Sequence, residues 1–235
     1  MKKLMFAAAA LAAGVAMATD VTSANVVGYN TTDNTAEDSS FIFGASFSGL
    51  STKGIVAFKD LASPQGFEDG DQIQTAFTDE AGLTQLYMYS YFSEWLDENY
   101  DPVADDAGIP LGGSAWFISA GDPKTITTSG EVEKQNFIHT FTESSALIAS
   151  AFPTAFCPNS ENVAWGVSDG AMIQTAFTDE SGLTQLYMYS YFGEWLDENY
   201  DTVPADSAIA PAGTGFWIIL ADPSETFSEV SPIAD

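Results

Sequence analysis

The chain has 235 residues, enough for one large domain or for two domains of about a hundred residues each. Hydrophobic residues make up 46% of it, close to the globular norm of about 45–50%, which excludes wholesale disorder. Its 33 acidic residues face only 6 basic ones, all of them lysines, and the formal net charge is −27. Such a charge repels phosphate backbones and anionic headgroups, so nucleic acid and anionic membrane surfaces are excluded as partners.

The first 18 residues have the three parts of a secretory signal peptide. Lys2 and Lys3 give a positive start, Leu4 to Val15 is apolar, and Ala16-Met17-Ala18 is a small-x-small cleavage site. The apolar stretch is well short of the roughly 20 residues that a membrane-spanning helix needs. We therefore expect cleavage after Ala18 and a secreted protein that is extracellular or lies at the cell surface.

A repeat of period 100 organises the rest of the chain. Residues 71–100 and 171–200 differ at only four positions, which are Asp71/Ala171, Gln72/Met172, Ala81/Ser181 and Ser93/Gly193. The match continues without gaps from Ile109 against Ile209, and upstream it fades with a shift of 105 residues (Ser39 against Ser144). Two copies of about a hundred residues are typical of tandem domains rather than of a solenoid. We expect a signal peptide at 1–18, a first β-unit at 19–130 and a second at 131–235.

Side chains within each copy alternate with the period of two that indicates strands. Residues 73–77 alternate, residues 78–82 have the composition of a hairpin loop, and a return strand is expected from Leu83 to Phe92. That strand would place three tyrosines on one face, namely Tyr87, Tyr89 and Tyr91. No segment after residue 18 has a sustained helical stripe. The pattern predicts an all-β protein of two tandem duplicated β-sandwich- or barrel-like units after the cleaved signal peptide.

The repeated aromatic residues form the first candidate site. Aromatic faces stack on sugar rings and anchor protein interfaces, so these residues are candidates for a partner or ligand surface. They are also suited to ordinary packing against a second sheet or the other copy, and the sequence leaves these alternatives open. The residues concerned are Tyr87, Tyr89, Tyr91 and Trp95, with their copies Tyr187, Tyr189, Tyr191 and Trp195.

The acidic loop after the return strand is the second candidate. Calcium is coordinated by about six to eight hard oxygen ligands, and carboxylates clustered in a loop supply them. The loop has neither the central glycine nor the twelfth-position glutamate of an EF-hand, so a solvated turn is the alternative. The candidate Ca²⁺ ligands are Asp97, Asp101 and Asp106 in the first copy and Asp197, Asp201 and Asp206 in the second.

The composition argues against an enzyme. One histidine, His139, and one cysteine, Cys157, cannot form the usual His/Cys zinc site, and no glycine-rich phosphate loop is present. A glycosidase needs only two carboxylates and an aromatic platform. Glu94 with Asp97, repeated as Glu194 with Asp197, is the pair that keeps this third function open.

Three further segments form a pattern, namely Ser23-Ala24-Asn25-Val26-Val27-Gly28-Tyr29, Gly70–Gln74 and Pro211–Trp217. Together they resemble a family of secreted bacterial proteins with no assigned activity. The chain departs from that pattern at Ala171, which stands where the first copy has Asp71, and at Pro110, which comes one place earlier than its counterpart. The resemblance implies a signal peptide, duplicated β-units and placement outside the cell, and nothing catalytic.

The start of the mature chain completes the prediction. Val26, Val27 and Tyr29 form a short β-prone stretch, which either pairs within its own unit or adds to the open sheet edge of a neighbouring subunit. We predict an exported, non-enzymatic structural protein that self-associates as the subunit of an extracellular filament or surface layer. The alternative is a carbohydrate-binding or adhesin-like secreted protein whose repeated aromatic strands bind a glycan.

Overall fold

The computed structural model describes residues 27–33, 40–49, 52–75, 86–175 and 186–233. The expected signal peptide, Val26 and the expected hairpin loops lie outside these residues. The described residues form strands joined by loops, and their one helical element is the 3₁₀ turn η1 (Phe58–Asp60). None of the described segments is a helix long and apolar enough to cross a membrane. The predicted all-β class is confirmed.

The first half of the structure, residues 27–131, contains a five-stranded sheet and two small sheets. The five-stranded sheet has the order β2-β8-β4-β5-β6, and the small sheets are the antiparallel pairs β1-β9 and β3-β7. The strands are β1 (Val27–Asp33), β2 (Ser40–Gly44), β3 (Ile55–Ala57), β4 (Gln72–Gln74), β5 (Leu86–Tyr89), β6 (Trp95–Leu96), β7 (Gly108–Pro110), β8 (Ser114–Ile118) and β9 (Thr125–Glu131).

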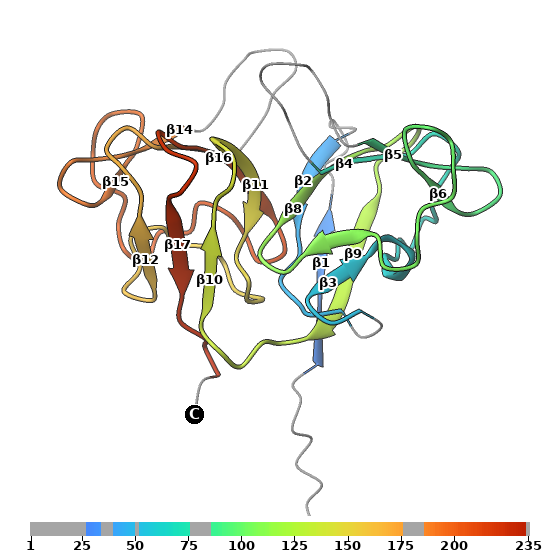
Figure 1. Ribbon diagram of the computed structural model, residues 1–235, viewed down its shortest axis with the longest axis horizontal. Helices are drawn as coiled ribbons and strands as arrows, with labels where there is room; N and C mark the ends of the chain where they lie inside the picture. The colour runs from blue at the N-terminus through green and yellow to red at the C-terminus, as the bar shows by residue number, and fades with distance from the viewer. Residues whose placement is uncertain (1–26, 34–39, 50–51, 76–85, 176–185, 234–235) are drawn as a thin grey trace, which may run out of the picture.

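The second half, residues 132–233, contains a five-stranded sheet of order β11-β16-β13-β14-β15 and a three-stranded sheet of order β10-β17-β12. Figure 1 shows the two five-stranded sheets side by side, with β6 at one end of the molecule and β15 at the other. The strands are β10 (Phe137–Thr140), β11 (Ser145–Ala149), β12 (Val163–Gly166), β13 (Met172–Gln174), β14 (Leu186–Tyr189), β15 (Trp195–Leu196), β16 (Gly215–Ile219) and β17 (Thr226–Glu229).

The two five-stranded sheets correspond strand for strand, and their registers correct the sequence alignment. Gln72 of β4 pairs with Ile118 of β8, whereas Met172 of β13 pairs with Ile219 of β16. Ile118 therefore corresponds to Ile219, a shift of 219 − 118 = 101, and the gapless match drawn from Ile109 was wrong by one residue there. The second half has one extra residue in the loop before β16. Upstream of this loop the two halves still correspond at a shift of 100, because Met88 pairs with Leu96 in the first half and Met188 pairs with Leu196 in the second.

Each half has its own apolar core between its five-stranded sheet and its smaller sheets. In the first half, Ile73 and Phe117 of the large sheet pack in one cluster with Val56 of β3 and Ile126 of β9. In the second half, Ile173 and Ile218 share a cluster with Phe227 of β17. The strand periodicity accounts for this arrangement, because alternate residues are buried throughout β9 and β17 and after the first residue of β8 and β16.

The two halves meet through reciprocal contacts between β2 and β8 on one side and β11 and β16 on the other. The amide of Gly44 donates to the carbonyl of Gly213 (2.7 Å), and the amide of Ala149 donates to the carbonyl of Gly112 (2.9 Å). These are the same contact made twice, because Gly44 corresponds to Ala149 and Gly112 to Gly213. The halves are thus related by an approximate twofold axis, the arrangement of an isologous dimer within one chain.

Equivalent residues face each other at this axis, and only one of each pair carries a side chain. A Cβ built on Gly44 would overlap the Cβ of Ala149, and a Cβ built on Gly215 would overlap that of Ser114. Gly44 and Ala149 are equivalent, as are Ser114 and Gly215. Two copies with identical residues here would either collide or leave a gap.

A small apolar cluster and a buried carboxylate complete the junction. Phe47 of the first half packs with Val132, Ala151 and Phe152. The hydroxyl of Ser46 donates to the carbonyl of Ser150 (2.9 Å). Glu229, which is 6% exposed, accepts hydrogen bonds from the Ser150 hydroxyl (2.8 Å) and the Ala151 amide (2.7 Å). Burial raises the pKa of Glu229 from 4.5 to about 7, because it disfavours the carboxylate more than these two bonds favour it.

Candidate functional site

A cleft lies beside the outer strand of each five-stranded sheet. The first-half cleft has a volume of about 340 Å³ and is lined by residues that include Phe58, Lys59, Phe67, Tyr89, Glu94 and Trp95. The second-half cleft has a volume of about 470 Å³ and is lined by residues that include Asn159, Val163, Trp165, Tyr189 and Glu194. Tyr89 and Glu94 therefore recur as Tyr189 and Glu194 in the same setting. Volumes of this size are typical of small-ligand pockets, which span about 300–1,000 Å³.

The tryptophans below these clefts belong to the core. Trp95 is 5% exposed and Trp195 is 0% exposed, so neither presents a ring face to a ligand. Each packs against the tyrosine of its own copy with ring centroids 5.2 Å apart (Tyr89–Trp95 and Tyr189–Trp195). Of the predicted aromatic surface, only Tyr89, Trp95 and Tyr189 line the clefts, and Trp95 does so as a core residue.

Tyr87 and Tyr187 also pack inward. The ring of Tyr87 lies 4.5 Å from that of Phe58, and both tyrosines are partly buried against their cores. Burial is the main cause of a raised pKa for both hydroxyls, and the neighbouring carboxylates at positions 97 and 98, or 197 and 198, raise it further. These two tyrosines are packing residues in the structure, which was the alternative that the sequence left open.

The expected row of three tyrosines is wrong, because the return strand ends three residues early. β5 ends at Tyr89, and the chain then turns, with the amide of Ser90 donating to the carbonyl of Glu94 (2.9 Å). Ser93 completes the turn at φ 64°, a value in the left-handed region that favours glycine, and Gly193 does so at φ 83°. Tyr91 and its copy are thereby separated from the inward-facing tyrosines.

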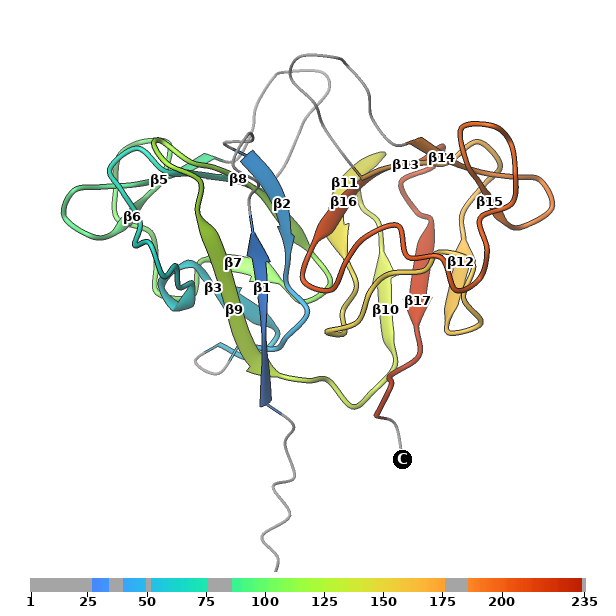
Figure 2. The ribbon, with the colours of Figure 1, turned by 180° about the vertical axis from the view of Figure 1, so that it is seen from behind.

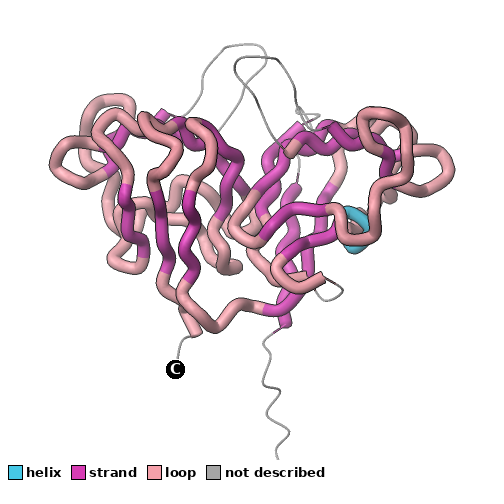
Figure 3. Tube along the Cα trace, viewed as in Figure 1, coloured by secondary structure: helices cyan, strands magenta, loops and turns pink. Residues whose placement is uncertain are grey.

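This turn exposes two adjacent aromatic side chains in each half. We call Tyr91 with Phe92 the first aromatic turn, and Tyr191 with Phe192 the second. The exposed fractions are 73% and 65% in the first turn and 84% and 85% in the second. Figure 3 shows that loops gather at the two ends of the molecule where these turns lie. Sequence reasoning missed Phe92 and Phe192, although Gly193 signalled that the strand ends there.

In each candidate calcium loop, the first aspartate accepts hydrogen bonds from backbone amides of the same loop. The Asp97 carboxylate accepts hydrogen bonds from the amides of Asn99 (2.8 Å) and Asp101 (3.0 Å), and Asp197 does the same in the second half. These backbone bonds lower the pKa of both aspartates. Side chains at positions 101, 106, 201 and 206 are exposed. In the described part of the chain, no group of three or more His, Cys, Asp or Glu residues is close enough to hold a metal ion.

The residues considered for catalysis lie in different surroundings. Glu94 lines the first-half cleft, whereas Asp97 does not and is bonded to its own loop. His139 is half-buried between Phe141 and Phe227, with ring centroids 4.6 and 5.8 Å away. Burial lowers its pKa and favours the neutral ring, as expected for a packing residue.

The N-terminal strand pairs within its own chain. Val27 and Tyr29 lie in β1, which is antiparallel to β9 over seven residue pairs, from Val27 opposite Glu131 to Asp33 opposite Thr125. Figure 2 shows β1 and β9 lying alongside each other. Tyr29 is 73% exposed. Pairing within the unit was one of the two alternatives for this segment.

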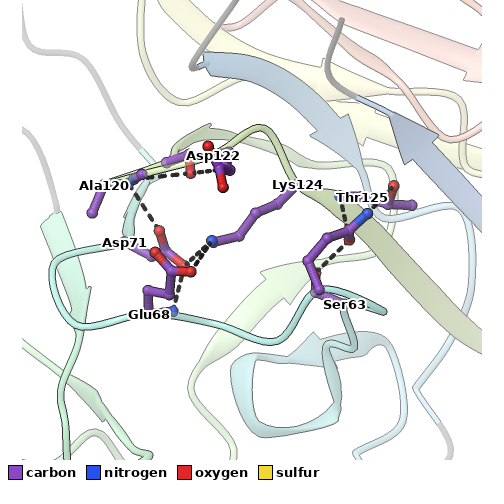
Figure 4. A network of polar contacts seen from close by, with 10 residues as sticks. Ser63, Glu68, Asp71, Ala120, Asp122, Lys124 and Thr125 are labelled. Atoms are coloured by element: carbon purple, nitrogen blue, oxygen red, sulfur yellow. Dashed lines mark hydrogen bonds and ion pairs between the residues drawn. The ribbon is translucent and has the colours of Figure 1, made fainter. Parts of the chain in front are cut away.

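A buried ion pair lies beside the first-half sheet (Figure 4). The ammonium of Lys124 is 3.8 Å from the Asp71 carboxylate and 3.4 Å from that of Glu68. Asp71 is fully buried and accepts hydrogen bonds from the amides of Glu68 (2.8 Å) and Ala120 (2.9 Å). Burying a charge requires such partners, and this lysine supplies the cation.

The second half has a different buried charge at the equivalent position. Ala171 replaces Asp71, and the carboxylate of Glu225 accepts a hydrogen bond from the amide of Ser168 (2.7 Å), which corresponds to Glu68. Glu225 is 7% exposed, and its other carboxylate oxygen, Oε2, has no hydrogen-bond partner. The two halves are therefore alike in backbone and unlike in buried charge.

Comparison with known proteins gives no relative: the chain matches no family model, no curated protein and no solved structure.

Proposed function

We propose that this chain is an exported, non-enzymatic structural protein that self-assembles into an extracellular filament or surface layer. In this proposal the signal peptide is cleaved after Ala18, and the two halves are tandem duplicated β-sandwich- or barrel-like units. The observation that carries the proposal is the pair of aromatic turns, one at each end of a molecule with approximate twofold symmetry.

The apolar area exposed at each aromatic turn supports a role in contacts between proteins. A buried aromatic side chain removes about 150–250 Å² from water, so two of them in one turn remove about 300–500 Å². Contiguous exposed apolar patches of this size on a monomer are often functional. A molecule with one such patch at each end has the two contact points that a growing chain of subunits needs.

The acidity of the chain sets the conditions for assembly. With a net charge of −27, copies repel one another at low ionic strength, and salt screens this repulsion. Calcium is part of the proposal as a cation that the exposed acidic loops bind weakly. The N-terminal strand β1, which pairs with β9, is a further contact segment for a neighbouring subunit in this proposal.

Light scattering and negative-stain microscopy on the chain from Thr19 test the proposal, with salt, calcium and chelator varied. We expect ordered fibres or sheets that form above a threshold concentration. The variant with all four turn aromatics replaced by alanine should stay monodisperse at the same temperature of unfolding. A wild-type chain that stays monomeric in every condition would refute self-assembly.

Carbohydrate binding is the second candidate, favoured by the cleft that recurs in both halves with a tyrosine and a glutamate. A partly exposed tyrosine beside a carboxylate is suited to one face and the hydroxyls of a sugar. A glycan array with the Tyr89→Phe plus Tyr189→Phe variant tests it, because this change removes the two hydroxyls and keeps the packing. Array binding by the wild type that the variant retains in full would exclude these clefts as the sugar site.

A further inference from the structure

A buried carboxylate of the second half has one oxygen that no described residue satisfies. Glu225 is 7% exposed, and its Oε1 accepts a hydrogen bond from the Ser168 amide (2.7 Å). Its Oε2 has no hydrogen-bond partner within the described residues, and Glu225 forms no ion pair with any of them. We propose that Glu225 binds a monovalent metal cation, Na⁺ or K⁺, from the medium. This inference goes beyond the proposed self-assembly and does not depend on it.

The first half of the chain shows which charge belongs next to this carboxylate. Glu225 accepts the amide of Ser168, just as the buried Asp71 accepts the amide of Glu68, the equivalent residue. The Glu225 carboxylate therefore corresponds in position to the Asp71 carboxylate. In the first half the ammonium of Lys124 lies 3.8 Å from that carboxylate and balances its charge (Figure 4). The second half keeps the anion without the lysine, so its cation comes from solution.

The cost of burying a charge explains why a cation is needed. A buried carboxylate is strongly unfavourable when it is alone and is tolerated when a cation lies beside it. The chain has no arginine, and none of the lysines after residue 18 pairs with Glu225. A water molecule can donate a hydrogen bond to Oε2, but it does not balance the charge. The net charge of −27 concentrates cations from the medium around the protein.

The groups around Glu225 suit a monovalent ion better than a divalent one. Calcium takes about six to eight oxygen ligands, usually with several carboxylates among them. In the part of the chain that the structure describes, no group of three or more His, Cys, Asp or Glu residues could hold a metal ion. One carboxylate balances a single positive charge, as one lysine does for Asp71. Ser168 is exposed, so an ion on that side can keep several of its water ligands.

Thermal unfolding in different salts tests this site. The protein is compared in NaCl, KCl and tetramethylammonium chloride at one ionic strength, so that general screening is the same in all three. Tetramethylammonium has the same charge but is too large to approach a buried oxygen. At a metal-ion concentration about ten times the dissociation constant, Na⁺ or K⁺ should raise the unfolding temperature by about 3–6 °C relative to tetramethylammonium. Dilute solution keeps self-assembly out of the measurement.

Two variants remove the proposed site in different ways. Glu225→Gln removes the charge and keeps an acceptor for the Ser168 amide. Ala171→Asp plus Glu225→Lys copies the first half and supplies an internal ammonium. Both variants should lose the difference between the metal salts and the tetramethylammonium salt, and both should reduce the broadening of the sodium NMR line by the protein. Glu198→Gln is the matched control, because it removes one charge at an exposed position and should keep the full difference.

Three results would overturn the proposal. Equal unfolding temperatures of the wild type in all three salts would mean that water or a proton satisfies Oε2. A metal-salt advantage that persists in Glu225→Gln would place the bound ion elsewhere on the acidic surface. An advantage that Glu198→Gln loses as fully as Glu225→Gln would be an effect of net charge alone. None of these results bears on self-assembly, which is measured separately at high protein concentration.

Discussion

Lys124 and Glu225 occupy equivalent positions in the two halves and carry opposite charges. Each directly precedes the strand that starts at Thr125 or Thr226, and both are buried, at 2% and 7% exposure. In the first half the anion is Asp71 and the cation is Lys124, whereas in the second half Glu225 reaches the corresponding backbone amide itself and Ala171 leaves room for it. The two changes are coupled, because a glutamate at position 124 beside Asp71 would place two buried carboxylates together without the lysine.

This compensation predicts a strong coupling between positions 71 and 124. Lys124→Glu alone should destabilise the protein by about 3–5 kcal/mol, because it removes the cation from a fully buried aspartate and adds a carboxylate. Lys124→Glu with Asp71→Ala copies the second half and should recover most of that loss. Urea denaturation of the single and double variants measures the coupling. Additive effects of the two substitutions would show that the residues do not share one site.

A second pair of exchanges tests the axis between the halves. Gly44→Ala alone should destabilise the junction by about 1–3 kcal/mol, because its new Cβ overlaps that of Ala149. Adding Ala149→Gly moves the single side chain to the other side of the axis and should restore part of the stability, because the contact of the new Cβ with the Thr214 carbonyl oxygen (3.0 Å) remains tight. Thermal unfolding of the single and double variants provides the measurement. Rescue is the decisive result, since overpacking at an unrelated site would not be relieved by Ala149→Gly.

The sequence predicted the fold class well and the surface poorly, for physical reasons. The alternation of apolar and polar residues around Ile73 indicates which side chains point into the core, and Ile73 is fully buried in the structure. The end of β5 depends on the turn at Ser93, where a non-glycine residue adopts a positive φ. Serine rarely adopts this conformation, so only Gly193 in the second copy indicated the turn, and the strand was wrongly extended to Phe92.

The alignment of the two copies did not show the one-residue shift at β16 or the exchange of buried charges, for a different reason. The match of Ile109 with Ile209 is good without a gap, and only strand register shows that Ile118 corresponds to Ile219. With the gapless alignment, Lys124 falls opposite Ser224 and its exchange for Glu225 is invisible. Tertiary contacts fix this correspondence, and local sequence similarity does not.

The division between core and surface aromatics predicts very different mutational costs. Trp195→Ala should destabilise the protein by about 3–5 kcal/mol, because the side chain is fully buried. Phe192→Ala should change stability by no more than about 0.5 kcal/mol, because 85% of that side chain is exposed. Chemical denaturation of the two variants in dilute solution checks both values. A large loss for Phe192→Ala would mean that the second aromatic turn packs within its own chain.

The last prediction concerns pH and follows from Glu229 at the junction. The pKa of its carboxyl is raised from 4.5 to about 7 in the folded state, so folding disfavours its ionised form. The resulting contribution to stability is fully present below pH 4.5 and is lost as the pH rises through 7. At 1.36 kcal/mol per pKa unit, the loss is about 3 kcal/mol. Glu229→Gln cannot ionise and should abolish this part of the pH dependence.

The measurement is the difference in unfolding free energy between the wild type and Glu229→Gln at several pH values. It should shift against the wild type by about 3 kcal/mol between pH 4.5 and 7.5, with most of the change below pH 7. A constant offset from the lost hydrogen bond to Ser150 or Ala151 does not affect this slope. Since the other carboxylates are common to both proteins, their titration cancels in the difference. A difference independent of pH would mean that Glu229 is solvated in the folded protein, and that the junction is more open than its hydrogen bonds indicate.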